Sequence, residues 1–151
     1  MADSYRDSLT LTLLRELHRA YRGVNCMDTE GIEAMGLAHS EFDVLATLGN
    51  TEGMPMGEMA TRMLTSPGNV TRLVKRLEGR GLVQRRRAEW SDRVVIASLT
   101  PAGEDLFEQT YPAQYRHVKR WFDARLSDDQ QQQLIDLLQS LQTPPGVAEE
   151  E

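Results

Sequence analysis

Residues 63–93 read MLTSPGNVTRLVKRLEGRGLVQRRRAEWSDR, which predicts a capped amphipathic helix followed by an arginine-rich β-hairpin. Ser66 is the expected N-cap, and Pro67 takes the first helical position, where a missing N–H costs nothing. Gly81 is placed to adopt the left-handed conformation that ends such a helix. The apolar stripe has the helical spacing i, i+3, i+4, i+7 and consists of Val70, Leu73, Val74 and Leu77.

The residues on either side of this helix extend the pattern. Residues 83–87 and 94–99 are β-prone and are joined by a short polar loop, which is typical of a hairpin. Upstream, apolar periodicity predicts one helix that begins near His39 and a short one after Pro55. Three helices followed by a hairpin form a helix-turn-helix with a β wing.

The outer parts of the chain are also expected to be helical. Apolar residues at spacings of three and four predict a helix over residues 8–27. A Thr-Pro pair at 100–101 begins a long helix, in which Pro112 should introduce a kink. The pattern S-x-x-Q at 127–130 is a capping box ahead of the last helix. The expected fold class is therefore mainly α, with six helices and a small β-hairpin wing.

Charge is distributed unevenly along this chain of 151 residues, whose formal net charge is −6. Residues 62–93 hold nine basic and three acidic side chains and therefore carry +6, which leaves −12 for the rest of the chain. A basic segment within an acidic protein is typical of a protein that binds a polyanion with one part of its surface.

The sequence does not favour a membrane protein, a secreted protein, a metalloprotein or an enzyme. No apolar run approaches the roughly 20 residues that span a bilayer, and the N-terminus lacks a secretory signal pattern, so we expect a cytoplasmic protein without membrane contact. A single cysteine, Cys26, excludes an internal disulfide. His18, His39 and His117 form no paired-ligand motif, and nucleophile and phosphate-loop motifs are lacking. We therefore expect no metal, no cofactor and no enzymatic activity.

The outward face of the predicted helix has the chemistry of a DNA-recognition helix. Small and hydrogen-bonding residues come first and cations follow in the next turns, which suits the base edges and phosphates of double-stranded DNA. A solvated surface helix is the alternative, but three consecutive arginines at 85–87 repel one another and favour an anionic partner. The candidate contacts on the helix are Ser66, Pro67, Gly68, Asn69, Thr71, Arg72, Lys75 and Arg76.

These motifs resemble the winged helix-turn-helix of the MarR (multiple antibiotic resistance regulator) family. The resemblance is carried by SPGNVTRLVKRLEGRGLVQRRR followed by VVIASLTPAGEDL, with EFDVLATL before and SDDQQQQLIDLLQSL after, and it covers roughly residues 37–142. It implies a homodimeric bacterial transcription factor, usually a repressor, that binds an operator. It also implies that the operator affinity changes with a small effector or with oxidation.

The resemblance also assigns roles within the wing. Family members usually carry Asp-x-Arg there, in which the arginine enters the minor groove and the aspartate steadies the wing. Here the arginine is Arg93, while Ser91 holds the aspartate position and Asp92 follows it. For Trp90 we expect packing against the hairpin, with contact to DNA as the alternative. The candidate wing contacts are Arg85, Arg86, Arg87, Ser91, Asp92 and Arg93.

The predicted organisation has three parts. Residues 37–100 form the DNA-binding domain, residues 1–36 and 101–143 form dimerisation helices, and residues 144–151 form a flexible tail. The end helices are apolar beyond the needs of one small domain, which suggests a two-fold interface rather than a monomer core. Such a homodimer would set two recognition helices at the spacing of a palindromic operator.

Two sensing sites are considered. In the family, small aromatic or anionic effectors bind where the dimerisation helices meet the winged domain, and the residues expected there are His18, Arg22, Phe42, Tyr111 and Tyr115. Cys26 offers a redox alternative, although it lies near the end of its helix among acidic residues, which disfavour the thiolate.

A protein-interaction module is the alternative to a DNA-binding regulator. In that case the basic winged helix would dock an acidic protein. The small residues at 66–69 favour DNA, because they suit a narrow groove better than a broad protein contact.

Overall fold

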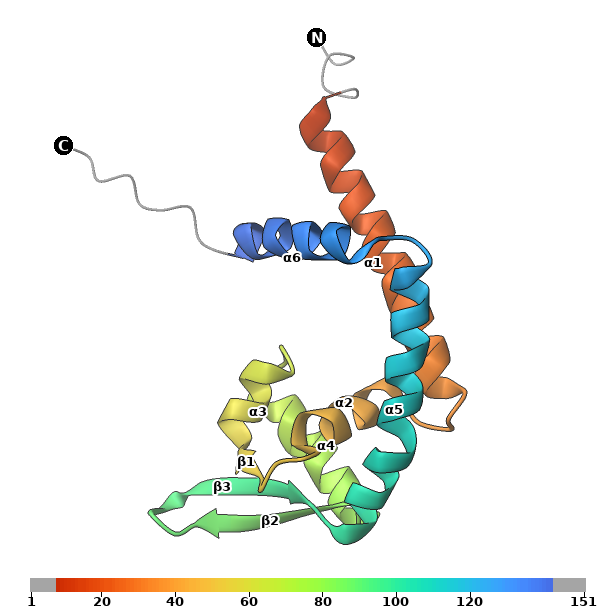
Figure 1. Cartoon of the computed structure of the whole chain (residues 1–151). Helices are drawn as coiled ribbons and strands as arrows, with labels where there is room; N and C mark the ends of the chain where they lie inside the picture. Colours follow the sequence, from red (N-terminus) through yellow and green to blue (C-terminus); the bar gives the residue numbers. More distant parts are fainter. Residues whose placement is uncertain (1–7, 143–151) are drawn as a thin grey trace, which may run out of the picture.

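The computed structural model describes residues 8–142, so the predicted tail at 144–151 lies outside the described residues. Six helices and a three-stranded sheet follow one another along residues 8–142 (Figure 1). This order confirms the predicted winged helix-turn-helix. The helices are α1 (Leu9–Glu33), α2 (His39–Leu48), α3 (Met56–Arg62), α4 (Pro67–Gly79), α5 (Pro101–Asp123) and α6 (Asp128–Gln142). The strands are β1 (Met54–Pro55), β2 (Val83–Ala88) and β3 (Ser91–Leu99).

Helix α4 has both ends that its sequence predicts. The Ser66 hydroxyl accepts the Asn69 N–H at 3.2 Å and so caps the N-terminus. Gly81 has a φ of +73°, which places it in the left-handed region. The Leu82 N–H then donates to the Leu77 carbonyl at 3.0 Å and closes the last turn. The length and register of α4 are thus set by local interactions.

The sheet has one strand more than the predicted hairpin. Its order is β1-β3-β2, with both pairings antiparallel, and β1 joins it through Met54 opposite Ala97 and Pro55 opposite Ile96. A strand of two residues is too short to produce a periodic pattern, so the sequence does not predict it. The register of β2 and β3 shifts between Arg87 and Ala88, next to the tip of the wing.

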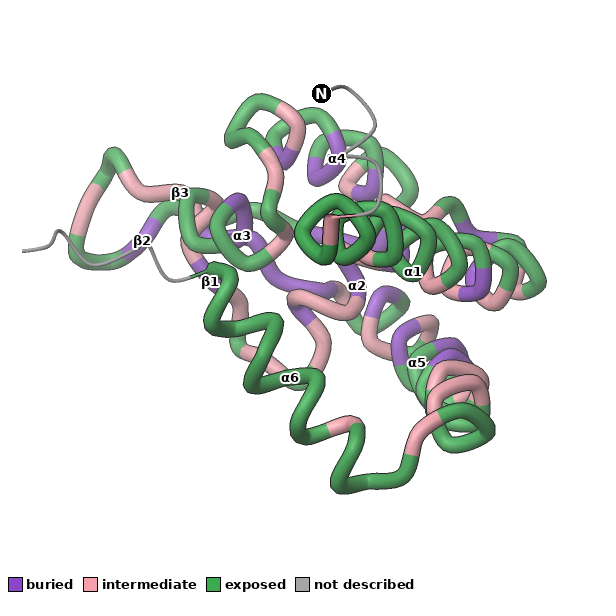
Figure 2. The backbone as a smooth tube through the Cα atoms, turned by 90° about the horizontal axis from the view of Figure 1, so that it is seen from above, coloured by how far each residue is buried: buried purple, intermediate pink, exposed green. Residues whose placement is uncertain are grey.

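One apolar core holds the winged part together. It lies between α2, α3, α4, the sheet and the first turns of α5, and Figure 2 shows its buried segments in purple. The apolar stripe of α4 faces this core, so the opposite face of α4 is directed outward. The fully or almost fully buried residues of the core include Val44, Leu45, Leu48, Met59, Val70, Leu73, Val74, Leu77 and Phe107.

The long helices extend away from the winged part. α1 and α5 lie side by side, and α6 turns back from the end of α5 across an open space (Figure 1). α1 ends at Glu33, six residues beyond the predicted limit, and α5 runs unbroken past Pro112. The capping box before α6 is confirmed, because the Ser127 N–H donates to Gln130 Oε1 at 2.9 Å. α6 has no buried residue, and among residues 8–142 no helix is long and apolar enough to cross a membrane.

Two glycines at the end of α4 provide a matched test of this helix end. Gly81→Ala should lower the free energy of unfolding by about 1–2 kcal/mol, because a side chain disfavours the left-handed backbone. Gly79→Ala lies within the helix with open space around it and should raise the free energy of unfolding by about 0.5–1 kcal/mol. Urea denaturation of both variants measures these changes, and equal effects of the two would contradict the assigned helix end.

Candidate nucleic-acid interface

The predicted contact residues of α4 lie on one outward face. Ser66, Pro67 and Gly68 are exposed at its N-terminus, and no Cβ clash constrains Gly68. Thr71, Arg72, Lys75 and Arg76 are exposed further along the helix, while Asn69 is half-buried. The face therefore begins with small groups and ends with cations, as the sequence predicts.

Asn69 organises the first turns of this face. Its Nδ2 donates to Thr65 Oγ1 at 2.8 Å, and its Oδ1 accepts from Arg72 Nη2 at 2.6 Å. Thr71 Oγ1 donates to the Pro67 carbonyl at 3.0 Å. Because Arg72 is held by Asn69, its guanidinium is directed along the outward face before any ligand is bound.

The wing lies along one flank of α4. Between the wing and α4 lies an open cleft, to which both Thr71 of α4 and Arg93 of β3 contribute. The cleft is lined by Pro55, Met56, Gly57, Thr71, Arg93, Val94 and Val95. Lower on the same flank, Arg85 Nη2 pairs with Glu78 Oε2 at 2.6 Å. The Arg85 guanidinium keeps the pKa of the Glu78 carboxyl below its usual value. Arg85 thus fixes the wing to α4. Arg86 and Arg87, which follow it on β2, are exposed as well.

The tip of the wing is held by short-range hydrogen bonds. Ser91 Oγ accepts the Arg93 N–H at 3.3 Å, so Ser91 holds the backbone of Arg93 from the position where the resemblance leads us to expect aspartate. Arg87 Nη1 donates to the carbonyl of Asp92. The Asp92 side chain is exposed and forms no ion pair within residues 8–142. A hydroxyl and a backbone carbonyl therefore accept the hydrogen bonds at the tip of this wing.

The expected packing of Trp90 against the hairpin is wrong. Trp90 is 71 % exposed and lies in the turn between β2 and β3. Ala88, the neighbouring residue on β2, is buried instead. Residue 90 belongs to the turn and to neither strand, and residue type alone does not reveal its exposure.

The other flank of α4 faces α2 and contains a cluster that no sequence motif indicated. Glu41 is 3 % exposed, and its Oε1 lies 2.8 Å from Arg80 Nη1 and 3.1 Å from Arg76 Nη2. Burial raises the pKa of Glu41, but the Ala38 N–H and the two guanidiniums outweigh burial and bring the pKa below its usual value. Glu41 therefore carries a negative charge at neutral pH. The usual S-x-x-E signature is missing because Ala38 is the N-cap.

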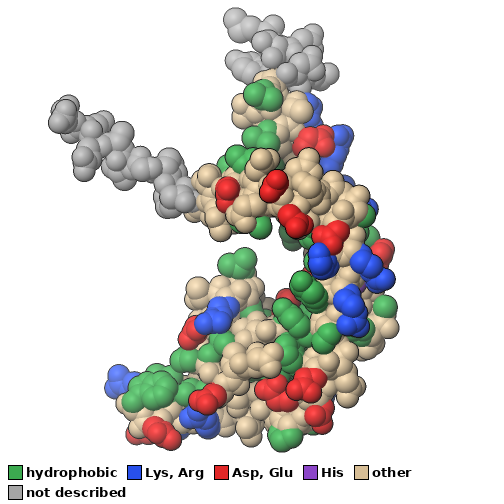
Figure 3. Space-filling view, viewed as in Figure 1, with side chains coloured by type: hydrophobic (Ala, Val, Ile, Leu, Met, Phe, Trp, Pro, Cys, Tyr) green, Lys and Arg blue, Asp and Glu red, His purple; other side chains and the backbone are tan. Residues whose placement is uncertain are grey.

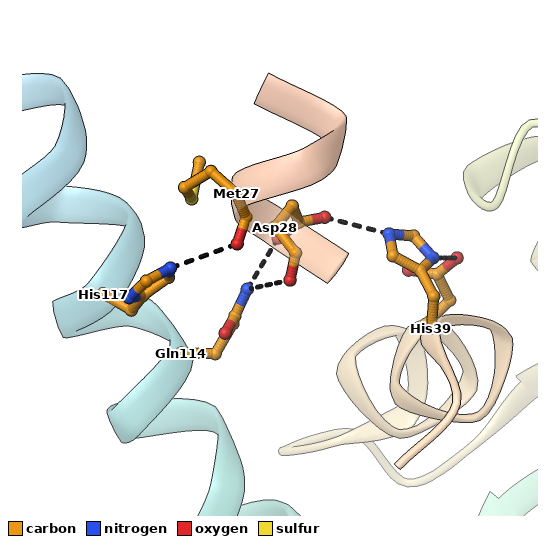
Figure 4. A network of polar contacts seen from close by, with 6 residues as sticks. Met27, Asp28, His39, Gln114 and His117 are labelled. Atoms are coloured by element: carbon orange, nitrogen blue, oxygen red, sulfur yellow. Dashed lines mark hydrogen bonds and ion pairs between the residues drawn. The ribbon is translucent and has the colours of Figure 1, made fainter. Parts of the chain in front are cut away.

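A polar network joins α2 to the long helices (Figure 4). The His39 ring lies between two carboxylates, with Nε2 2.9 Å from Asp28 Oδ2 and Nδ1 3.2 Å from Asp43 Oδ2. Gln114 of α5 donates to Asp28 Oδ1 at 2.7 Å, and His117 donates to a backbone carbonyl of α1. Burial raises the pKa of Asp43, against the opposing effect of His39. The first turn of α2 is thus the point where the winged part meets α1 and α5.

The five predicted effector residues do not all come together. The rings of Phe42 in α2 and Tyr111 in α5 stack with centroids 6.2 Å apart. Tyr115 is 58 % exposed on the same helix. His18 and Arg22 are exposed on α1, and Arg22 lines a shallow depression formed by α1 residues alone. Only the aromatic pair therefore forms a compact group at the junction.

Cys26 lies exposed on α1 in an environment that favours its thiol form. Its Sγ is 3.3 Å from Glu30 Oε1. The hydrogen bond to Glu30 and the Glu30 charge raise the pKa of Cys26 above its usual value. The redox alternative consequently gains no support from the structure. Among residues 8–142, no group of three His, Cys, Asp or Glu side chains is arranged to hold a metal ion.

Comparisons with known proteins agree on one family. The MarR family model matches residues 37–95. The HTH-type transcriptional regulator YkoM of Bacillus subtilis (strain 168) is 31 % identical over 128 residues, which cover 85 % of this chain and 82 % of YkoM.

Solved structures share the fold. AbsC, a MarR family transcriptional regulator from Streptomyces coelicolor, matches with a TM-score of 0.82 at 23 % identity, over 89 % of this chain and 93 % of AbsC. A mutant MarR from E. coli complexed with operator DNA matches with a TM-score of 0.77 at 21 % identity, over 87 % of this chain and 94 % of that protein.

Proposed function

The chain belongs to the MarR family of DNA-binding transcriptional regulators, and we propose that it binds a palindromic operator as a homodimer and acts as a repressor. The observation that carries the proposal is the outward face of α4. That face presents exposed small groups at its N-terminus and exposed cations behind them, and α4 has no acidic residue before Glu78. A solvated surface helix does not require this order of residues, whereas a helix that binds in a major groove does.

We assign DNA binding to the winged part, residues 37–100. The α4 residues that would meet base edges and nearby phosphates are Ser66, Pro67, Gly68, Asn69, Thr71, Arg72, Lys75 and Arg76. From the wing, Arg93 would enter the minor groove, with Arg86 and Arg87 near the backbone. Three further residues would hold the wing in place, namely Arg85, Ser91 and Asp92. Arg85 pairs with Glu78, the Ser91 hydroxyl accepts the Arg93 N–H, and the Asp92 carbonyl accepts from Arg87.

We assign dimerisation to residues 1–36 and 101–143, of which the described parts are α1, α5 and α6. Figure 3 shows hydrophobic side chains on both sides of the open space between α6 and the winged part. An apolar groove between α5 and α6 is lined by Phe122, Leu126, Gln131, Leu134, Ile135 and Leu138. Leu9, Leu13 and Leu14 of α1 are also 48–85 % exposed. A second copy of the chain would cover these apolar surfaces, which together are large for a monomer.

We place the effector site at the junction of α1, α2 and α5. Support comes from the Tyr111 ring, which is 42 % exposed and stacks on the buried Phe42, so that it offers an aromatic surface to an aromatic ligand. The polar network around Asp28 and His39 adjoins this surface. A ligand bound there would contact both the long helices and α2, and so would act on the spacing of the two recognition helices.

Two arginines provide the test of DNA binding. Arg72→Ala and Arg93→Ala should each weaken binding to a duplex that the wild-type protein selects from random-sequence DNA, by about tenfold or more. The slope of log affinity against log salt should fall by about 0.9 for each phosphate that the variant no longer neutralises. Fluorescence anisotropy from about 50 to 200 mM salt measures both quantities.

Arg19→Ala is the control, because Arg19 is an exposed cation on α1 that pairs with Glu16. It should bind as the wild type does. Wild-type affinity in the double variant of Arg72 and Arg93, or binding that does not respond to salt, would contradict the proposal. Binding of an acidic protein in place of DNA would favour the interaction module instead.

Leu138 provides the test of the homodimer. Leu138→Glu should convert the protein to a monomer, because a charge on the apolar face of α6 would be buried without a partner. Gln133→Glu places the same charge on an exposed polar position of α6 and should leave the dimer intact. Sedimentation velocity distinguishes the two states. A monomeric wild type at micromolar concentration would contradict this part of the proposal.

A further inference from the structure

Glu41 is a buried carboxylate in the first turn of α2 that faces α4 rather than solvent. Its side chain is 4 % exposed, and it binds Arg80 and Arg76 through Oε1 at 2.8 and 3.1 Å. Its Oε2 accepts the Ala38 N–H at 3.2 Å. Both oxygens are therefore occupied, and the carboxylate is enclosed by two cations and a helix N-terminus.

Arg76 differs from Glu41 in its exposure. The Arg76 side chain is 59 % exposed, although one of its terminal nitrogens binds the buried carboxylate. A guanidinium has five N–H donors, so Arg76 retains donors that can meet a second anion. It lies one helical turn beyond Arg72, on the flank of α4 that faces α2. Arg76 thus borders the outward face while remaining attached to the interior.

We propose that Glu41 is a positioning residue for DNA binding, which holds the Arg76 guanidinium at this edge so that its free donors meet a backbone phosphate. The inference rests on the proposed function and adds to it a residue that does not itself touch DNA. The two arginines and Glu41 together keep a charge of +1, and the guanidiniums separate the carboxylate from the phosphate.

The physical gain is preorganisation. A free arginine side chain loses rotamer freedom when it binds a phosphate, and that loss weakens the contact. Arg76 has already lost part of this freedom in the ion pair with Glu41. The rigid planar fork of arginine can serve two anions in fixed directions, which the single ammonium of lysine cannot do equally well.

The position of Arg76 also complements the wing. Arg93 borders α4 on the opposite flank, in the cleft that it shares with Thr71. The outward face of α4 therefore has an exposed cation on each side, of which Arg76 is held by Glu41. A helix in a major groove has a phosphate backbone on each side. Glu41 fixes the cation at one of these borders, and at the other Ser91 accepts only the backbone N–H of Arg93.

Three variants and a matched control test the inference. Glu41→Gln and Arg76→Ala should each weaken binding to the selected duplex about tenfold at low salt and lower the salt slope by about 0.9. The double variant should bind no more weakly than Arg76→Ala, because both changes remove the same phosphate interaction. Glu58→Gln is the control, since it breaks an exposed ion pair with Arg62 on α3 and should bind as the wild type does.

Arg76→Lys separates positioning from charge. It keeps the cation but loses the fork, and Arg80 still neutralises Glu41, so this variant remains informative if Glu41→Gln does not fold. We expect it to bind nearly as weakly as Arg76→Ala. Wild-type affinity of Arg76→Lys, or additive effects of Glu41→Gln and Arg76→Ala, would overturn the positioning role. Failure of the wild type to select any duplex would instead overturn the proposed function.

Discussion

The burial of one apolar stripe on α4 is the constraint on which the interface depends. Val70, Leu73, Val74 and Leu77 are 0–3 % exposed. Burial of each such side chain contributes about 1.5–3 kcal/mol, and successive helix residues are about 100° apart. A rotation of α4 by one residue would expose part of this stripe, so the helix cannot roll. Asn69 and Arg72 therefore face outward because the other side of α4 belongs to the core.

Ion pairs on both flanks complete the placement of α4. Arg85 of β2 holds Glu78 on the side of the wing, and Glu41 of α2 holds Arg76 and Arg80 on the other side. Each pair uses a carboxylate to fix a cation while the surface stays basic overall. The first turn of α2 also binds α1 through His39, so a chain of ion pairs runs from α1 through α2 to α4.

The sequence predicts those features that depend on neighbouring residues. Caps such as Ser66 and the helix end at Gly81 follow from local rules, and the structure contains them. The structure was needed where distant segments meet. Gln114 binds Asp28 across 86 positions, and β1 is too short to show a pattern of its own. The exposure of Trp90 depends on the shape of a turn, which the type of residue does not determine.

We propose that two copies of this winged domain bind one DNA duplex through α4 and the wing. Hydroxyl-radical footprinting of the protein on a duplex that it selects tests this claim most directly. We expect two equivalent protected patches whose centres lie about 34–36 Å apart, one turn of the DNA helix. A single protected patch, or uniform protection along the duplex, would contradict it.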